Sequence, residues 1–178
     1  GRITLVPGLV QTDQVLTVQQ AIAEGKHTRL ADLFLITDED FDGFQYAHAW
    51  SFVYFLLNTP DYARSFERFF EELYTQQLKG YKTEKLDAGW DDKTGQRQRY
   101  APEDVRDALL KRLKKKSVEE LESEWLAFVR EIPIAGPQAR FMRAYYTVKY
   151  GEGDSEQALA DITFALANGV DDPRAFWT

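Results

Sequence analysis

Apolar residues recur at the three- and four-residue spacing of amphipathic helices along most of this 178-residue sequence. The segment from Tyr46 to Leu57 is apolar at almost every position, which is typical of a helix buried at the centre of a bundle. We therefore expect Trp50 in this helix, and Phe69 in the next one, to be buried. A short run at Ile3–Val6 is the one candidate strand. The pattern predicts an all-α fold.

Proline, glycine and capping residues divide the sequence into successive helices. Pro60, Pro102 and Pro137 stand at predicted helix starts, and Gly25 and Gly80 stand at predicted ends. The predicted helices cover about 12–25, 46–57, 60–80, 102–116, 117–132, 137–150 and 155–168.

The segment Ile132–Pro137 contains two prolines and a glycine and is the clearest boundary in the chain. We predict a bundle of about five helices over residues 1–132, followed by a helical hairpin of repeat type over 133–178 that packs on it. Residues 81–101 are polar and aperiodic, which predicts a loop. A loop of this length in a compact domain is either an excursion with a role or an insertion.

The balance of charges argues against nucleic acid as a partner. The chain carries 22 basic and 29 acidic residues, for a net charge of −7. The basic run Lys111–Lys116 closes a predicted helix, where cations interact favourably with the helix dipole, and we interpret it as a solvated helix end. The longest apolar run, Trp50–Leu57, is too short to span a bilayer, so we expect no membrane insertion.

The sequence lacks the motifs of a self-contained enzyme. It has no cysteine and only two histidines, His27 and His48, and it contains no H-E-x-x-H pair, P-loop or glycine-rich dinucleotide turn. A histidine without a motif partner specifies no metal site. We expect no cofactor and no complete catalytic site within these residues.

An acidic segment offers a weak calcium candidate. Asp38, Asp40 and Asp42 alternate and are followed by Gly43, as in the first half of a calcium-binding loop. The twelfth position, where such a loop carries a bidentate glutamate, is Ala49. The alternative is an acidic loop before a helix, where negative charge is favoured by the dipole.

Four segments resemble the C-terminal half of gluzincin-like zinc peptidase domains of the MA superfamily, which include many uncharacterised bacterial members. They are Tyr46–Leu57 (YAHAWSFVYFLL), Phe66–Leu73 (FERFFEEL), Ser117–Trp125 (SVEELESEW) and the shorter Leu30–Ile36. The resemblance covers Leu30–Glu131, mostly through packing residues.

This resemblance implies a part of a longer protein. In the family, zinc is held by an H-E-x-x-H helix and a following glutamate, both upstream of the region matched here. The chain is then the non-catalytic C-terminal helical portion of a peptidase-related protein, and the upstream catalytic region of that protein is its partner. The full-length protein could bind zinc, and the family suggests a bacterial protein outside the cytoplasm.

One active-site role transfers with the resemblance. A family tyrosine at the start of this helix, in a Tyr-Glu-Lys-Gly context, hydrogen-bonds the oxyanion of the tetrahedral intermediate, and Tyr46 takes its place here. Ala47, His48 and Ala49 replace the other three residues. The alternative is a core tyrosine with a satisfied hydroxyl. His48 lies about 200° around the helix from Tyr46, so the two should not share a site.

The last two predicted helices resemble a tetratricopeptide-type pair. Ala144 and Tyr145 in the first helix, with Ala158, Ile162 and Ala165 in the second, have the pattern of closely packed repeat helices. A single such pair needs neighbours to bury its faces. The resemblance implies a second function class, a helical module that binds a protein or peptide partner.

Overall fold

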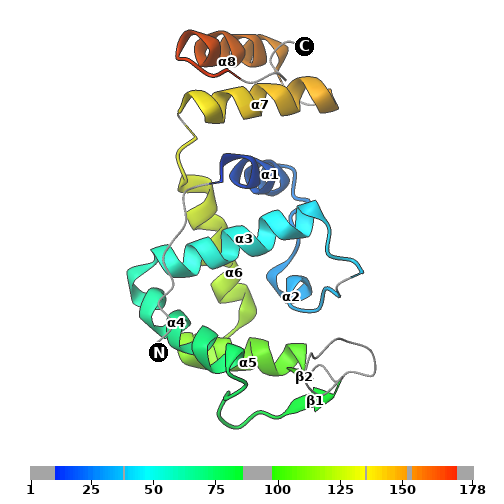
Figure 1. Ribbon diagram of the computed structural model, residues 1–178, viewed down its shortest axis with the longest axis vertical. Coiled ribbons are helices and arrows are strands. Elements are labelled where there is room, and N and C mark those ends of the chain that lie inside the picture. Colours follow the sequence, from blue (N-terminus) through cyan, green and yellow to red (C-terminus); the bar gives the residue numbers. More distant parts are fainter. Residues whose placement is uncertain (1–10, 38, 86–97, 135, 152–153, 172–178) are drawn as a thin grey trace. The chain divides into compact units, whose positions relative to one another are not determined.

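The computed structural model describes residues 11–37, 39–85, 98–134, 136–151 and 154–171, and all statements below concern these residues. They form eight helices and one pair of short strands (Figure 1), which confirms the predicted all-α class. The helices are α1 (Thr12–Ala23), α2 (Leu30–Leu33), α3 (Gly43–Asn58), α4 (Pro60–Tyr74), α5 (Pro102–Leu113), α6 (Val118–Glu131), α7 (Pro137–Tyr150) and α8 (Ser155–Ala167). The candidate strand Ile3–Val6 lies outside the described residues.

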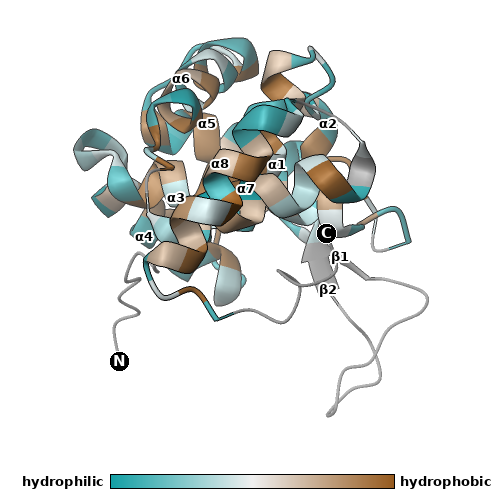
Figure 2. Cartoon of the chain, turned by 90° about the horizontal axis from the view of Figure 1, so that it is seen from above, coloured by the Kyte–Doolittle hydropathy of each residue, from teal (hydrophilic) through white to brown (hydrophobic). Residues whose placement is uncertain are grey.

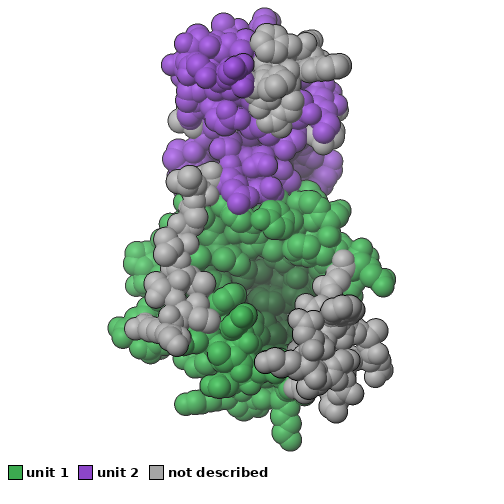
Figure 3. Space-filling model, viewed as in Figure 1, with its two compact units in different colours: residues 1–8, 28–128 green, residues 9–27, 129–178 purple. Residues whose placement is uncertain are grey.

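Two compact units make up the chain (Figure 3). Unit 1 comprises residues 1–8 and 28–128, and unit 2 comprises residues 9–27 and 129–178. This division differs from a boundary at residue 132, because α1 belongs with α7 and α8. The Gln19 side chain of α1 donates hydrogen bonds to the carbonyl oxygens of Val129 and Ile132, at 2.8 and 3.0 Å. These contacts join residues far apart in the chain, so helical periodicity alone could not predict them.

The core of unit 1 is built from α2 to α6. Its fully buried side chains include Leu30, Leu56, Leu109, Leu121 and Trp125. Hydrophobic and hydrophilic residues are mixed along the ribbons of the helices, as expected for amphipathic helices with one side in a core (Figure 2).

The short helix α2 depends on a residue of α6. The largely buried Glu122 accepts a hydrogen bond from the backbone N–H of Leu30, at 2.5 Å, and lies 3.3 Å from the Arg29 guanidinium. This N–H belongs to the first residue of α2 and has no acceptor within that helix. A tertiary contact therefore helps form a helix of only four residues.

The apolar helix α3 is buried on one side only. Its interior face consists of Ala47, His48, Ser51, Phe52, Phe55 and Leu56. The expectation that Trp50 is buried is wrong, because this side chain is partly exposed and stacks on Tyr54, with ring centroids 5.1 Å apart. Phe69 is buried as expected. The small Ser51, rather than the larger Trp50, faces the interior because Trp125 of α6 occupies the space beside it.

Helix α4 ends at Tyr74, before the expected stop at Gly80. The chain turns at Gln76, which has a positive φ of 56°. Leu78 then enters the core, and its backbone N–H donates to the hydroxyl of the buried Tyr100, at 2.9 Å. The helix is closed locally, by the backbone N–H of Gln77 donating to the carbonyl oxygen of Glu72 at 2.7 Å, and the bond to Tyr100 fixes the chain that follows.

The segment predicted as a loop at 81–101 contains two short antiparallel strands. β1 (Thr83–Lys85) pairs with β2 (Gln98–Tyr100), with Thr83 opposite Tyr100. Strands of three residues are too short to produce a readable alternation of apolar and polar positions, so the sequence did not indicate them. Residues 86–97 lie outside the described residues.

Unit 2 contains α1, α7 and α8. Its core cluster consists of Phe141, Met142 and Ala165, with Leu16, Tyr145, Tyr146 and Val170 packed against it. Across both units, none of the described helices combines the length and apolarity needed to cross a membrane.

Candidate functional site

The first candidate residue, Tyr46, lies in the first turn of α3. Its side chain is 44% exposed, and its backbone N–H donates to the carbonyl oxygen of Asp42, at 2.9 Å. His48 is fully buried, with Nδ1 2.8 Å from the carbonyl oxygen of Phe44. Tyr46 and His48 therefore lie on different sides of α3, as the helical spacing predicts.

The described carboxylates of the acidic segment make local contacts. Asp42 caps α3: its Oδ1 accepts from the backbone N–H groups of Phe44 and Gln45, at 2.7 and 3.1 Å. Asp40 accepts from the Thr37 hydroxyl at 2.9 Å. Asp38 lies outside the described residues. Within the described ranges, no three His, Cys, Asp or Glu side chains are grouped as a metal site would require.

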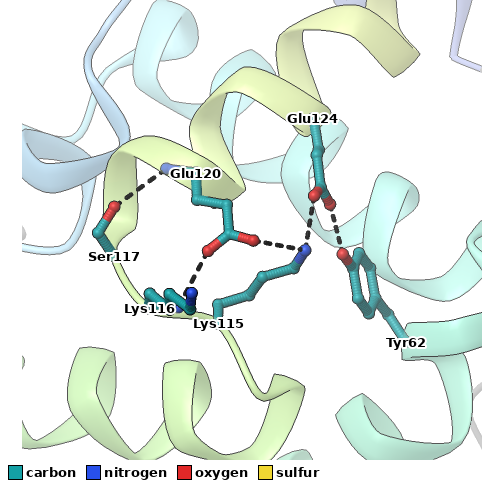
Figure 4. A network of polar contacts seen from close by, with 6 residues as sticks. All are labelled: Tyr62, Lys115, Lys116, Ser117, Glu120 and Glu124. Atoms are coloured by element: carbon teal, nitrogen blue, oxygen red, sulfur yellow. Dashed lines mark hydrogen bonds and ion pairs between the residues drawn. The ribbon is translucent and has the colours of Figure 1, made fainter.

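A polar network joins α4, the α5–α6 turn and α6 in unit 1 (Figure 4). Lys115 Nζ lies 2.5 Å from a carboxylate oxygen of Glu124 and 3.3 Å from one of Glu120. The Tyr62 hydroxyl donates to Glu124, and the Lys115 ammonium lies 5.3 Å from the centre of the Tyr62 ring. These contacts connect three segments of the chain, which indicates a structural role. We call them the Lys115 network.

Ser117 and Glu120 cap the start of α6 in a variant of the capping box. Ser117 Oγ accepts from the Glu120 backbone N–H at 3.2 Å, while Glu120 accepts from the backbone N–H of Lys116 at 3.0 Å instead of from Ser117 itself.

The basic run Lys111–Lys116 is only partly a solvated helix end. The Lys115 side chain is 12% exposed and is paired as described, and Arg112 forms a 2.5 Å ion pair with Glu72 of α4. The interpretation of the whole run as solvated is therefore wrong for these two residues. Their acidic partners lie on other helices, which the local sequence did not identify.

Hydrogen bonding and burial raise the pKa values of two groups in this network, Lys115 and Tyr62. The hydrogen bond to Glu124 is the largest cause that raises the pKa of Lys115, and burial followed by the hydrogen bond to Glu124 raises the pKa of Tyr62. Folded protein then keeps both protons at pH values where the unfolded chain loses them. Their contribution to stability is complete below about pH 10, the ordinary range of both groups, and is lost as the pH rises further.

We expect Lys115→Met to weaken this alkaline loss of stability. The free energy of unfolding, measured by urea denaturation from about pH 8 to 11, should fall less steeply in the variant than in the wild type. Lys111→Met, at an exposed position of α5, is the matched control and should keep the wild-type slope. Equal slopes for all three proteins would show that the Lys115 network does not determine how steeply the free energy of unfolding falls at alkaline pH.

An ion pair between a partly exposed arginine and a fully buried aspartate joins α7 to α8, and the sequence analysis did not identify it. Arg143 Nε and Nη2 lie 2.6 and 2.8 Å from the two carboxylate oxygens of Asp161, and Gln157 donates to Asp161 at 3.1 Å. Asp161 is fully buried, and the pair raises the pKa of Arg143. Asp161 lies at helical spacing from Ala158 and Ala165, on the face of small residues. An acidic residue on a face expected to be buried could have indicated an ion pair.

Asp154 caps the start of α8 without the side chain of Gln157. Asp154 accepts from the backbone N–H groups of Glu156 and Gln157, at 2.8 and 3.3 Å, and so caps the helix. The side chain of Gln157 bonds to Asp161 instead of returning to the cap.

A second side of α8 is apolar and exposed. Leu159 is 68% exposed, Leu166 is 43% exposed and Ile162 between them is partly buried. Their spacing of three and four residues places them along one stripe of the helix. We call these three residues the outer α8 face. It is distinct from the small-residue face of Ala158, Asp161 and Ala165, which is buried.

Comparisons with protein families, curated proteins and solved structures found no significant match to this chain. No family assignment follows from them.

Proposed function

We propose that this chain is a non-catalytic helical interaction module that binds an amphipathic helix on its outer α8 face. The observation that carries this proposal is the exposure of Leu159 and Leu166 on one stripe of a well-packed helix. Burying a leucine side chain contributes about 1.5–3 kcal/mol, and helices commonly bind other helices through such stripes.

The hairpin presents this stripe in a fixed geometry. Arg143 and Asp161 join α7 to α8 by two parallel hydrogen bonds, and the C-terminal end of α8 packs on the Phe141–Met142 cluster through Ala165. A surface that is already ordered loses little conformational entropy on binding, which favours affinity. The net charge of −7 supports a protein partner over nucleic acid.

The test uses a fluorescein-labelled amphipathic peptide of leucine and lysine as the probe. Fluorescence anisotropy should show saturable binding to the wild-type chain. The double variant Leu159→Asp with Leu166→Asp should bind at least about tenfold more weakly, because tenfold corresponds to about 1.4 kcal/mol, less than two buried leucines contribute.

The matched control is Ala160→Asp with Ala167→Asp. It adds the same two charges, at the same spacing, on exposed positions about 100° around the helix. It should bind the peptide as the wild type does. Equal weakening in both double variants would mean that binding does not depend on the outer α8 face, and the proposal would fail.

The exposure of Tyr46 favours a second candidate function. A phenol that is 44% exposed in the first turn of a helix can reach a ligand, as the oxyanion role in a gluzincin-like protein requires. In that case the chain is the non-catalytic C-terminal helical portion of a zinc peptidase-related protein. An H-E-x-x-H motif in the gene upstream of residue 1 would support this candidate, and upstream sequence without zinc ligands would remove it.

A further inference from the structure

Helix α7 packs against two helices that repeat each other, α1 and α8 (Figure 1). α1 begins Thr-Asp-Gln-Val-Leu and α8 begins Ser-Glu-Gln-Ala-Leu. When Thr12 is aligned with Ser155, buried residues of the two helices coincide without a gap. These pairs are Val15 with Ala158, Val18 with Asp161 and Ile22 with Ala165. The surroundings of α8 can therefore be compared with those of α1, position by position.

The alignment equates the outer α8 face with a side of α1 that forms an interface. Leu159 corresponds to Leu16, which is partly buried and packs against the core cluster of unit 2. Ile162 corresponds to Gln19, whose side chain donates to two carbonyl oxygens at the C-terminal end of α6. Leu159 itself is 68% exposed. The side that α1 uses for packing is thus largely uncovered in α8, among the residues that the structure describes.

Differences between the two helices indicate what the outer α8 face binds. The amide of Gln19 suits backbone carbonyl oxygens, whereas Ile162 offers only apolar surface. Ala23 of α1 is small and exposed, whereas its counterpart Leu166 is large. Leu159, Ile162 and Leu166 therefore continue the apolar stripe over about two helical turns. A stripe of this length fits the side of a helix, in contrast to the helix end that Gln19 contacts.

The charges of α7 and α8 define the partner further. Both charged residues of α8, Glu156 and Asp161, are acidic, whereas every charged residue of α7 is an arginine or a lysine. The covered side of α8 uses this difference, because Asp161 pairs with Arg143. The exposed Glu156 lies three residues before Leu159, about 60° around α8 from it, and so flanks the outer α8 face. A basic residue of a partner helix can pair with Glu156 there.

We infer that the partner of the outer α8 face is a helix of another protein that resembles α7 in composition. It presents large apolar side chains such as Phe and Met to this face and carries basic residues beside them. The inference rests on the proposed function, because it names the chemistry of the helix that this face binds. The model for the contact is Leu16, which packs on a cluster that contains Phe141 and Met142. α7 itself is already engaged by α1 and α8, so the partner comes from another chain.

A fluorescein-labelled peptide with the α7 sequence, Pro137–Tyr150, is the probe, and fluorescence anisotropy should show saturable binding to the full chain. Leu159→Asp with Leu166→Asp should bind it at least about tenfold more weakly, and Ala160→Asp with Ala167→Asp should bind it as the wild type does. Added acids attract a basic peptide, so any weakening comes from lost apolar contacts. Undiminished binding to the leucine variant would place the peptide elsewhere, for example on the side of α8 that α7 covers, and would overturn the inference.

A change in the peptide tests the apolar pair. The peptide with Phe141→Ala and Met142→Ala keeps every basic residue of the probe. It should bind the wild-type chain at least about tenfold more weakly, because two large apolar side chains no longer reach the leucines. Equal affinity of the two peptides would show that charge alone is recognised, and the inference would fail.

Glu156→Lys and Glu103→Lys form a matched pair for the charge. Both residues are exposed and each is the second residue of its helix, but Glu103 belongs to α5 in unit 1. Glu156→Lys should weaken binding of the α7 peptide about threefold, in the range of an exposed ion pair, while Glu103→Lys should leave it unchanged. Equal affinities of the two variants would contradict a basic partner at this face.

These outcomes are distinct from a failure of the proposed function. If the leucine and lysine peptide depends on Leu159 and Leu166 but the α7 peptide does not, the face binds helices of another composition and only this inference fails. If neither peptide depends on the two leucines, the proposed function fails as well.

Discussion

Replacing Trp125 with alanine should lower the free energy of unfolding by about 3–5 kcal/mol, the usual cost of a large-to-small change in a core. Trp125 is the largest fully buried side chain of the described residues. Its ring packs edge-on against Phe52, at a centroid distance of 5.7 Å, and its Nε1 donates to Ser51 Oγ at 3.1 Å. The variant creates a cavity and also removes the donor from a buried hydroxyl. Chemical denaturation followed by circular dichroism measures the effect.

Trp50→Ala is the matched comparison, with the same change on a helix that contacts Trp125. Because Trp50 is partly exposed and its ring stacks on the ring of Tyr54 near the surface, we expect a loss clearly smaller than that of Trp125→Ala. Equal losses would mean that Trp50 is as deeply buried as Trp125 and lies on the interior face of α3. An unchanged denaturation midpoint for Trp125→Ala would contradict the core described for unit 1.

Removing the Arg143 guanidinium should be the second most damaging change. Arg143→Met keeps most of the aliphatic stem and leaves the fully buried Asp161 carboxylate with Gln157 as its remaining described partner. Breaking a buried ion pair from one side typically costs about 3–5 kcal/mol, and we expect about 2–4 kcal/mol here because the Arg143 side chain is 39% exposed and partly screened by water. Urea denaturation of the variant measures this loss.

The double variant Arg143→Met with Asp161→Leu separates an unpaired charge from lost packing. With both partners apolar, no buried carboxylate remains, so much of the lost stability should return. If the double variant is as unstable as Arg143→Met alone, the loss comes from the shape of the hairpin interface and not from the uncompensated charge.

Local signals explain why most helix boundaries could be predicted. Prolines at 60, 102 and 137 occupy first helical positions, and Gly25, Gly151 and Gly169 have the positive φ that ends helices. These effects act within one turn of the chain and need no tertiary partner. The predicted starts at Pro102, Pro137 and Ser155 are therefore confirmed.

The candidate site was less predictable, because its residues depend on distant neighbours. Helical spacing is sufficient to predict which residues make up the outer α8 face. The exposure of that face depends on which side of α8 packs against α7. Asp161, on the small-residue side of α8, pairs with Arg143 of α7 and so turns that side of α8 towards α7. Spacing identifies a stripe of residues and does not show what covers it.

The sequence by itself therefore determined the class of the fold, the order of its helices and most of their ends, because periodicity and capping are properties of neighbouring residues. Only the tertiary structure decided that Ser51 instead of Trp50 faces Trp125, that Glu122 caps α2, that Leu78 bonds to Tyr100 and that α1 packs with α7. Each of these depends on the packing and hydrogen bonding of residues far apart in the chain, which local patterns do not encode.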